Sequence, residues 1–124
     1  MPANHFFRMR RSVLIIFGGL VLCSCASIHD SPDFERHRYS QVTEPFDRND
    51  VIYFDVTFSA QFPDDDAQAE ATRMEWLEDW LKQRKMCGDK GYEIITRRPF
   101  EMMEYNPANH DIRYEFKCGS APAE

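Results

Sequence analysis

The chain lacks the long apolar segment that a bilayer-spanning helix requires. Its apolar run without charge, Val13 to Leu22, has ten residues, and a helix of that length spans roughly 15 Å, about half of a ~30 Å hydrocarbon core. The chain also lacks an excess of basic residues. Its 15 Lys and Arg against 21 Asp and Glu give a net charge of −6, which argues against nucleic acid as a partner. At 124 residues it is too short for more than one domain.

Catalytic signatures are missing as well. The sequence contains no G-x-S-x-G, H-E-x-x-H or P-loop spacing. After residue 50 the only histidine is His110, and a body of this size leaves little room for a pocket. We therefore expect a protein that is not an enzyme, with no catalytic residues, no metal site and no dissociable cofactor. A small periplasmic enzyme or a redox protein is the alternative.

The pattern of residues 1–24 is typical of an export signal. Arg8, Arg10 and Arg11 precede the apolar run, and small residues follow it, as in a secretory signal peptide. An uncleaved membrane anchor stays open as an alternative, because continuing the run to Ile28 would lengthen it.

The end of the apolar run, Leu22-Cys23-Ser24-Cys25, resembles the lipobox of bacterial lipoproteins: an aliphatic residue, two small residues, then the cysteine that is lipidated. The resemblance implies cleavage before Cys25 and a diacylglyceryl group on its thiol. Cys23 is the poorer candidate, because Leu22 would then stand where a small residue is expected. An ordinary secretory signal with two incidental cysteines is the alternative. The residue after Cys25 is Ala26 and not aspartate, which resembles lipoproteins that are sorted to the outer membrane.

Lipidation would decide how the protein meets the membrane. Removal of the signal takes away three arginines and no acidic residue, which changes the net charge from −6 to −9. An acidic body is repelled by anionic lipid, whereas two or three acyl chains anchor a protein stably. We therefore expect a protein held by its lipid in the cell envelope, at the outer membrane and facing the periplasm.

The mature chain divides into a tether and a body. Residues 25–50 are charged and have no sustained hydrophobic period, so we expect a lipidated N-terminus and a flexible tether. Phe34, Tyr39 and Phe46 are its possible docking points onto the body. Residues 51–119 are expected to form the compact domain, and residues 120–124 a tail.

The body begins with a strand and a helix. Apolar residues occupy alternate positions from Ile52 to Phe62, as in a strand with one buried face. Pro63 ends the strand, and the three residues Asp64 to Asp66 supply a cap and negative charge for the helix that follows. We expect that helix over about Asp65 to Met86, with Gly88 at its C′ position.

Two further strands complete the predicted fold. One runs from Gly91 to Arg98, with Tyr92, Ile94 and Thr96 on a common face, and the other from Asp111 to Cys118. The fold class is therefore α+β, in the order β-α-β-β: one helix packed on one face of a small, mostly antiparallel three-stranded sheet. The other face is expected to show charged and polar side chains to water: Asp55, Thr57, Glu93, Arg97, Arg113, Glu115 and Lys117.

The apolar face of the helix contains two tryptophans. At about 100° per residue, Met74, Trp76, Leu77, Trp80 and Leu81 share one broad face. We expect Trp80 and Leu77 to hold the helix to the sheet. Trp76 lies further round the helix, so its truncation should affect stability less. Arg73 projects into the same face, where it can snorkel to the rim, pair with Glu70 or stack on a tryptophan. A partner-binding stripe that includes Trp76 and Arg73 is the alternative to a core.

Two cysteines remain in the body, and an oxidising envelope favours a disulfide between Cys87 and Cys118. The bond also selects the strand register. A tight turn at residues 106–109 would place Cys118 opposite Arg97. The strand that contains Arg97 begins at Gly91, about 20 Å away, so Cys87 would hardly reach Cys118. A long irregular loop from Pro99 to His110 would instead place Cys118 opposite Gly91 or Tyr92, within reach of Cys87. We predict the long loop.

The body resembles small Gram-negative envelope lipoproteins in two stretches, Cys87-Gly-Asp-Lys-Gly-Tyr-Glu-Ile and the terminal Tyr-x-Phe-Lys-Cys. This resemblance implies a disulfide-bonded α+β body and no particular activity. We expect a tethered module that binds an envelope protein, such as a secretion component or a lytic enzyme. Methionine and aromatic side chains are enriched in interfaces. The candidate surface is accordingly Phe100, Met102, Met103 and Tyr105, with Trp76 and Arg73 as further candidates. The alternative is that Phe100 and Met102 fold back onto the sheet.

Overall fold

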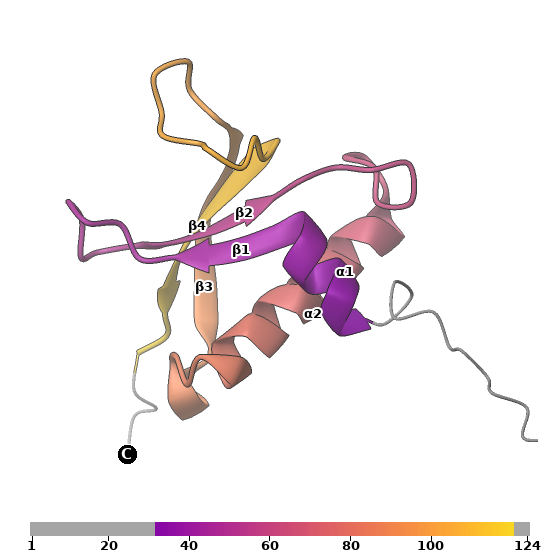
Figure 1. The fold of residues 1–124 in the computed structure, drawn as a ribbon. Helices are drawn as coiled ribbons and strands as arrows, with labels where there is room; N and C mark the ends of the chain where they lie inside the picture. The colour runs from indigo at the N-terminus through magenta and orange to yellow at the C-terminus, as the bar shows by residue number, and fades with distance from the viewer. Residues whose placement is uncertain (1–31, 121–124) are drawn as a thin grey trace, which may run out of the picture.

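The computed structural model describes residues 32–120 as a four-stranded antiparallel sheet with two α-helices (Figure 1). The predicted α+β class is therefore confirmed, but the predicted count of one helix and three strands is wrong. The export signal, Cys23, Cys25 and residues 121–124 lie outside the described residues. The elements are α1 (Pro32–Tyr39), β1 (Ser40–Thr43), β2 (Ile52–Val56), α2 (Ala67–Gln83), the 3₁₀ helix η2 (Gly88–Lys90), β3 (Tyr92–Pro99) and β4 (Ile112–Cys118).

Helix α1 and strand β1 occupy residues that the sequence pattern assigned to a tether. Their anchor is a buried cation: the Arg36 guanidinium lies 3.2 Å from Asp33 and 3.6 Å from Asp79 of α2, and it donates to the Gln83 side chain. The Tyr39 ring stacks on Trp76, with centroids 6.3 Å apart. Only a few apolar side chains, among them Tyr39 and Val42, help the Arg36 cation to hold this segment. It therefore has no sustained hydrophobic period that could reveal it from sequence.

Strand β2 is shorter than the alternating pattern predicted. It pairs with β4 from Ile52 to Val56 and then leaves the sheet, and the Asp111 carboxylate accepts the backbone N–H of Phe58 at 2.6 Å. The chain crosses to α2, whose N-terminus is capped as expected: Asp66 accepts the N–H of Ala69 at 2.7 Å. The helix ends at Gln83, earlier than predicted, so Lys85, with a φ of 53°, occupies the C′ position expected for Gly88. Gly88 also has a positive φ, of 52°, but it lies in η2.

The two tryptophans of α2 have the opposite order of burial from the prediction. Trp76 is only 3% exposed and packs edge-to-face on Phe62 at 4.9 Å, whereas Trp80 is half-buried. Helix α1 lies beside α2 (Figure 1), and Tyr39 at its end stacks on Trp76. Leu77 is fully buried, as predicted. The core gathers Val42, Phe54, Val56, Phe62, Ala69, Trp76, Leu77, Leu81, Ile112, Tyr114 and Phe116.

Strand order β1-β2-β4-β3 inserts the last strand between β2 and β3. The β3–β4 ladder contains a bulge: Ile94 pairs with Phe116, but Thr96 pairs with Glu115. The extra residue reverses the side-chain alternation after it. The prediction that Thr96 shares a face with Tyr92 and Ile94 is therefore wrong.

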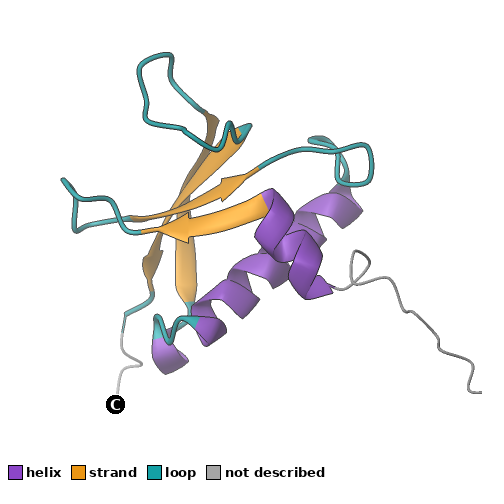
Figure 2. Ribbon diagram, in the orientation of Figure 1, coloured by secondary structure: helices purple, strands orange, loops and turns teal. Residues whose placement is uncertain are grey.

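Neither α-helix within residues 32–120 is long and apolar enough to cross a bilayer. Both helices lie against one side of the sheet, and the β1–β2 and β3–β4 loops extend away from them (Figure 2). The open face of the sheet and these two loops are the parts of the molecule that the helices leave uncovered.

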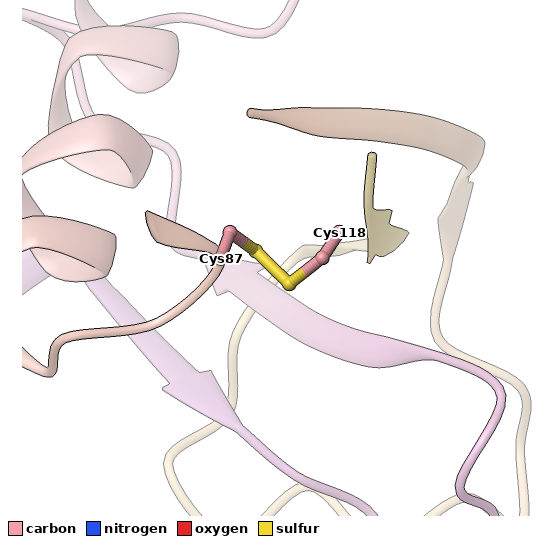
Figure 3. Close-up of a disulfide and its surroundings, with 2 residues drawn as sticks. All are labelled: Cys87 and Cys118. Carbon is pink, nitrogen blue, oxygen red and sulfur yellow. A yellow bond between two sulfur atoms is a disulfide. The ribbon is translucent and has the colours of Figure 1, made fainter. Parts of the chain in front are cut away.

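A disulfide joins the end of the helical segment to the end of β4, as predicted (Figure 3). The Cα atoms of Cys87 and Cys118 are 5.0 Å apart, and Cys118 pairs with Tyr92 across the ladder. This is the register of the long β3–β4 loop. Close packing at the same corner requires a glycine after the cysteine, since a Cβ on Gly119 would lie 2.1 Å from the carbonyl oxygen of Lys90.

The disulfide is expected to be structural. Replacing both Cys87 and Cys118 with alanine should lower the free energy of unfolding, measured with denaturant, by about 2–4 kcal/mol. A tryptic digest without reductant should join the peptides that contain the two cysteines. Two free thiols in the purified protein, or a double variant as stable as wild type, would contradict this account.

Candidate functional site

The open face of the sheet is not the solvated surface that the sequence predicted. Asp55, Arg113 and Glu115 are all buried there, because the β1–β2 and β3–β4 loops supply side chains that cover them. Arg97 departs from the prediction in another way: it pairs with Tyr114 on the helix side of the sheet and binds Asp64 at 2.7 Å. Of the predicted set, Glu93 and Lys117 do remain exposed, as a loose ion pair at 3.6 Å.

The Arg113 guanidinium is the centre of this face. It donates two hydrogen bonds to Asp55, at 2.7 and 2.9 Å, across the β2–β4 ladder. The Tyr53 ring centroid lies 3.8 Å from its Cζ atom, and the Phe100 centroid lies 4.6 Å away. A cation that contacts two aromatic rings and donates two hydrogen bonds to a carboxylate is well compensated for its loss of water.

Glu104 fastens the β3–β4 loop onto this centre. Its carboxylate accepts two hydrogen bonds from Arg98, both at 2.8 Å, and one from Arg113 at 2.6 Å. It also accepts the backbone N–H of Glu101 at 3.0 Å. The hydrogen bonds from Arg98 are the largest cause of a fall in the pKa of Glu104 to about 2. The middle of the loop is therefore held in place by charge.

The β1–β2 loop is fastened by a second arginine. Arg48 donates to Glu115 at 3.0 Å and to Asp50 at 2.9 Å. Thr96, turned to this face by the bulge, donates to the other oxygen of Glu115 at 2.9 Å. Both loops thus end up tied to the same side of the sheet.

A groove of about 580 Å³ lies between the two loops. Tyr53 and Arg113 of the sheet line it, together with residues 43–47 of the β1–β2 connection and the pair Glu104 and Tyr105. The polar atoms of Arg113 and Glu104 in it are already bound to one another and to Asp55 and Arg98. The charges of Arg113 and Glu104 at the base of the groove are therefore satisfied within the protein, whereas Glu44 and Asp47, which also line it, form no ion pair within residues 32–120.

The β3–β4 loop displays most of the residues that the sequence singled out. Met102 and Met103 are 97% and 93% exposed, and Tyr105 is 83% exposed. Phe100 is half-buried over Arg113, so it folds back as the alternative reading held, while Met102 does not. Phe46 at the tip of the β1–β2 loop is fully exposed. Phe46 was predicted from the sequence as a possible docking point onto the body, and its place on this surface was not predicted.

Trp76 and Arg73 do not belong to this surface. Both are buried in the core, and Arg73 pairs with Glu70 at 2.9 Å, one of the options the sequence left open. Its guanidinium also donates to the carbonyl oxygens of Phe62 and Pro63. Arg73 therefore fixes the segment before α2 to the helix, which is a structural role.

A second polar cluster joins α2 to the sheet. The Tyr114 hydroxyl donates to Glu70 at 2.8 Å, and burial raises the pKa of Tyr114 to about 12. Burial alone would raise the pKa of Glu70 as well, but hydrogen bonds from Tyr114 and Arg73 outweigh it and lower that pKa. Every charged member of this cluster has a partner within it, which is the arrangement of a structural tie.

His110 makes the contact closest in form to a catalytic pair. Its Nδ1 lies 2.8 Å from the Thr57 hydroxyl, but its Nε2 is buried without a partner in the described part of the chain. A base that activates a hydroxyl needs a group that orients its other nitrogen. Burial is the main cause that lowers the pKa of His110. The lowered pKa favours a neutral imidazole, and its contact with Thr57 joins the end of the β3–β4 loop to the segment that follows β2.

The strength of the Glu104 tie is expected to depend on pH. In the unfolded chain the carboxyl titrates near its ordinary pKa of 4.5, and in the fold near 2. The unfolded state therefore binds more protons, and the stabilisation is full above pH 4.5 and lost as the pH falls towards 2. Denaturant unfolding of wild type and Glu104→Gln from pH 7 to pH 2.5 should show a stability difference that shrinks in this window. A difference independent of pH would contradict the assignment.

Within residues 32–120 no three His, Cys, Asp or Glu side chains gather as a metal site would require.

Comparison with known proteins adds no function to this geometry. No protein-family model, no curated protein and no solved structure is significantly similar to this chain.

Proposed function

We propose that this protein is a lipid-anchored lipoprotein of the bacterial cell envelope that acts as a non-catalytic binding or accessory module for another envelope protein. The lipid at Cys25 holds the acidic body at the outer membrane, facing the periplasm. The proposal for the anchor stands on the lipobox-like residues 22–25 and on the disulfide, which suits an oxidising compartment.

One observation carries the binding role. Four large apolar side chains stand almost free in water on two neighbouring loops: Phe46, Met102, Met103 and Tyr105. Exposing them has a cost in solubility, and the ion pairs of Glu104 and Arg48 hold the loops that display them. Exposed apolar side chains on a fixed scaffold mark an interaction surface.

The anchor is tested by metabolic labelling with a clickable palmitate analogue. Wild type and Cys23→Ser should both be labelled, because Cys23 only precedes the cut. Cys25→Ser should not be labelled. Label that survives in Cys25→Ser would move the modification or remove the lipoprotein proposal.

The binding role is tested by photo-crosslinking in native envelopes. A photoreactive phenylalanine analogue is placed at Tyr105, at Phe46 or, as the control, at Ile95, which is exposed in the β3 bulge. We expect the same protein adduct from the first two positions and none from the third. No adduct, or equal adducts from all three positions, would overturn the proposal.

A further inference from the structure

We infer that the partner of this surface is a basic segment with an apolar face, which lies between the β1–β2 and β3–β4 loops. The inference deepens the proposed function and rests on it. Its grounds are the placement of apolar side chains, the charges that remain unpaired beside them, and the shape of the groove.

The apolar side chains gather at one place. Of the five large apolar residues that are exposed within residues 32–120, all except Ile95 belong to the two loops. Phe46 and Tyr105 also line the groove, one from each loop. An occupant of the groove would therefore meet apolar side chains from both directions. Methionine side chains such as Met102 and Met103 are flexible and adapt to different apolar surfaces.

The free charge around these side chains has one sign. Glu44 and Asp47 line the groove, and Glu101 immediately precedes Met102. None of these three carboxylates forms an ion pair in the described residues. The basic side chains nearby, Arg48 and Arg98, are both bound to carboxylates.

Charge also decides between two kinds of occupant. A second copy of this chain would bring the same unpaired carboxylates against one another, and like charges oppose contact. A basic partner pairs with them and is steered towards them from a distance. An apolar face alone would not use the acidic rim, and a purely basic segment would not cover the exposed methionines. A helix or strand that has both an apolar face and basic residues fits the exposed apolar side chains, the unpaired carboxylates and the groove.

The probe is a fluorescent amphipathic peptide that repeats Leu-Lys-Lys-Leu-Leu-Lys-Leu twice. Its binding to the folded, unlipidated chain from Cys25 is followed by fluorescence anisotropy. We expect saturable binding that weakens with salt, because exposed charges are screened. The analogue with Glu for Lys and the analogue with Ser for Leu should not bind. Absence of saturable binding, or equal binding of either analogue, would overturn the inference.

Two sets of variants locate the binding. Met102→Ser with Met103→Ser should weaken binding about tenfold or more, since each buried methionine contributes on that scale. Glu44→Gln, Asp47→Asn and Glu101→Gln together should weaken it about tenfold. The matched control removes three exposed carboxylates on and around α2: Asp65→Asn, Glu75→Gln and Asp89→Asn. Equal loss in the control would mean attraction by net charge alone and would overturn the inference.

All the substituted loop side chains are exposed, so the variants should fold as wild type does, and circular dichroism checks this. The outcome also separates the two claims. If Tyr105 and Phe46 gave adducts in envelopes but the basic peptide did not bind, the proposed protein-binding role would stand and the inference of a basic partner would be overturned.

Discussion

Replacing Asp55 with alanine is expected to lower the free energy of unfolding by about 3–5 kcal/mol, because it leaves the Arg113 guanidinium buried without its main partner. Both side chains are buried, and two hydrogen bonds of 2.7 and 2.9 Å join them. Glu104 still contacts Arg113 in the variant, but it is shared with Arg98. Urea unfolding followed by circular dichroism measures the effect.

A control on the same face separates burial from charge. Glu93→Gln breaks an exposed pair with Lys117 at 3.6 Å and should change stability by less than about 1 kcal/mol. The double variant Asp55→Leu with Arg113→Met removes both charges and should recover part of the loss. A loss in Asp55→Ala no larger than that in Glu93→Gln would contradict the account of this centre.

The second large effect is expected at Trp76. Its replacement by alanine should cost about 3–5 kcal/mol, as for other buried tryptophans, because it is buried and packs against both Phe62 and Tyr39. Trp80→Ala should cost about 1–2 kcal/mol, in the usual range for point variants. Trp80 is half-buried and donates its indole N–H to the Ser40 hydroxyl at 2.9 Å.

The order of these two costs is itself the test, measured by denaturant unfolding with circular dichroism at a helix wavelength. It also tests whether residues 32–43 belong to the fold, since Tyr39 and Ser40 lie in that segment. A larger cost for Trp80→Ala than for Trp76→Ala would contradict this order of burial and favour the packing expected from sequence alone, in which Trp80 holds the helix to the sheet.

Sequence reasoning succeeded where the signal is local or covalent. Alternation indicated the strand that begins at Ile52, and Asp66 caps the helix that follows. The pairing of Cys87 with Cys118 constrained the β3–β4 register to its observed value, Tyr92 opposite Cys118. A disulfide between residues far apart in the sequence restricts how two strands can pair, which the secondary-structure propensity of single residues does not do.

It failed where long-range charge pairs shape the molecule. Arg36 holds α1 through Asp79 and Gln83, and no periodic pattern marks such a contact. The bulge at Ile95 moves Thr96 to the open face, and one inserted residue leaves no clear mark in the sequence. The burial of Asp55 and Arg113 depends on loops whose course is set by these same ion pairs.

The candidate site was predicted in part for the same reasons. The composition of the β3–β4 loop singled out Met102, Met103 and Tyr105, and they are exposed. The contribution of Phe46 required knowledge that the β1–β2 loop borders the same groove. Trp76 and Arg73 were candidates because an amphipathic helix looks alike whether its apolar face meets a core or a partner.

The central claim, that the loop surface is free in the isolated protein and covered in its native setting, is tested most directly by methionine oxidation. Oxidation of methionine follows its exposure. In the purified protein, dilute peroxide should oxidise Met102 and Met103 faster than the half-buried Met74 and Met86. In native envelopes the account predicts that Met102 and Met103 become protected while Met74 and Met86 keep their rates. Equal oxidation of Met102 and Met103 in both preparations would contradict it.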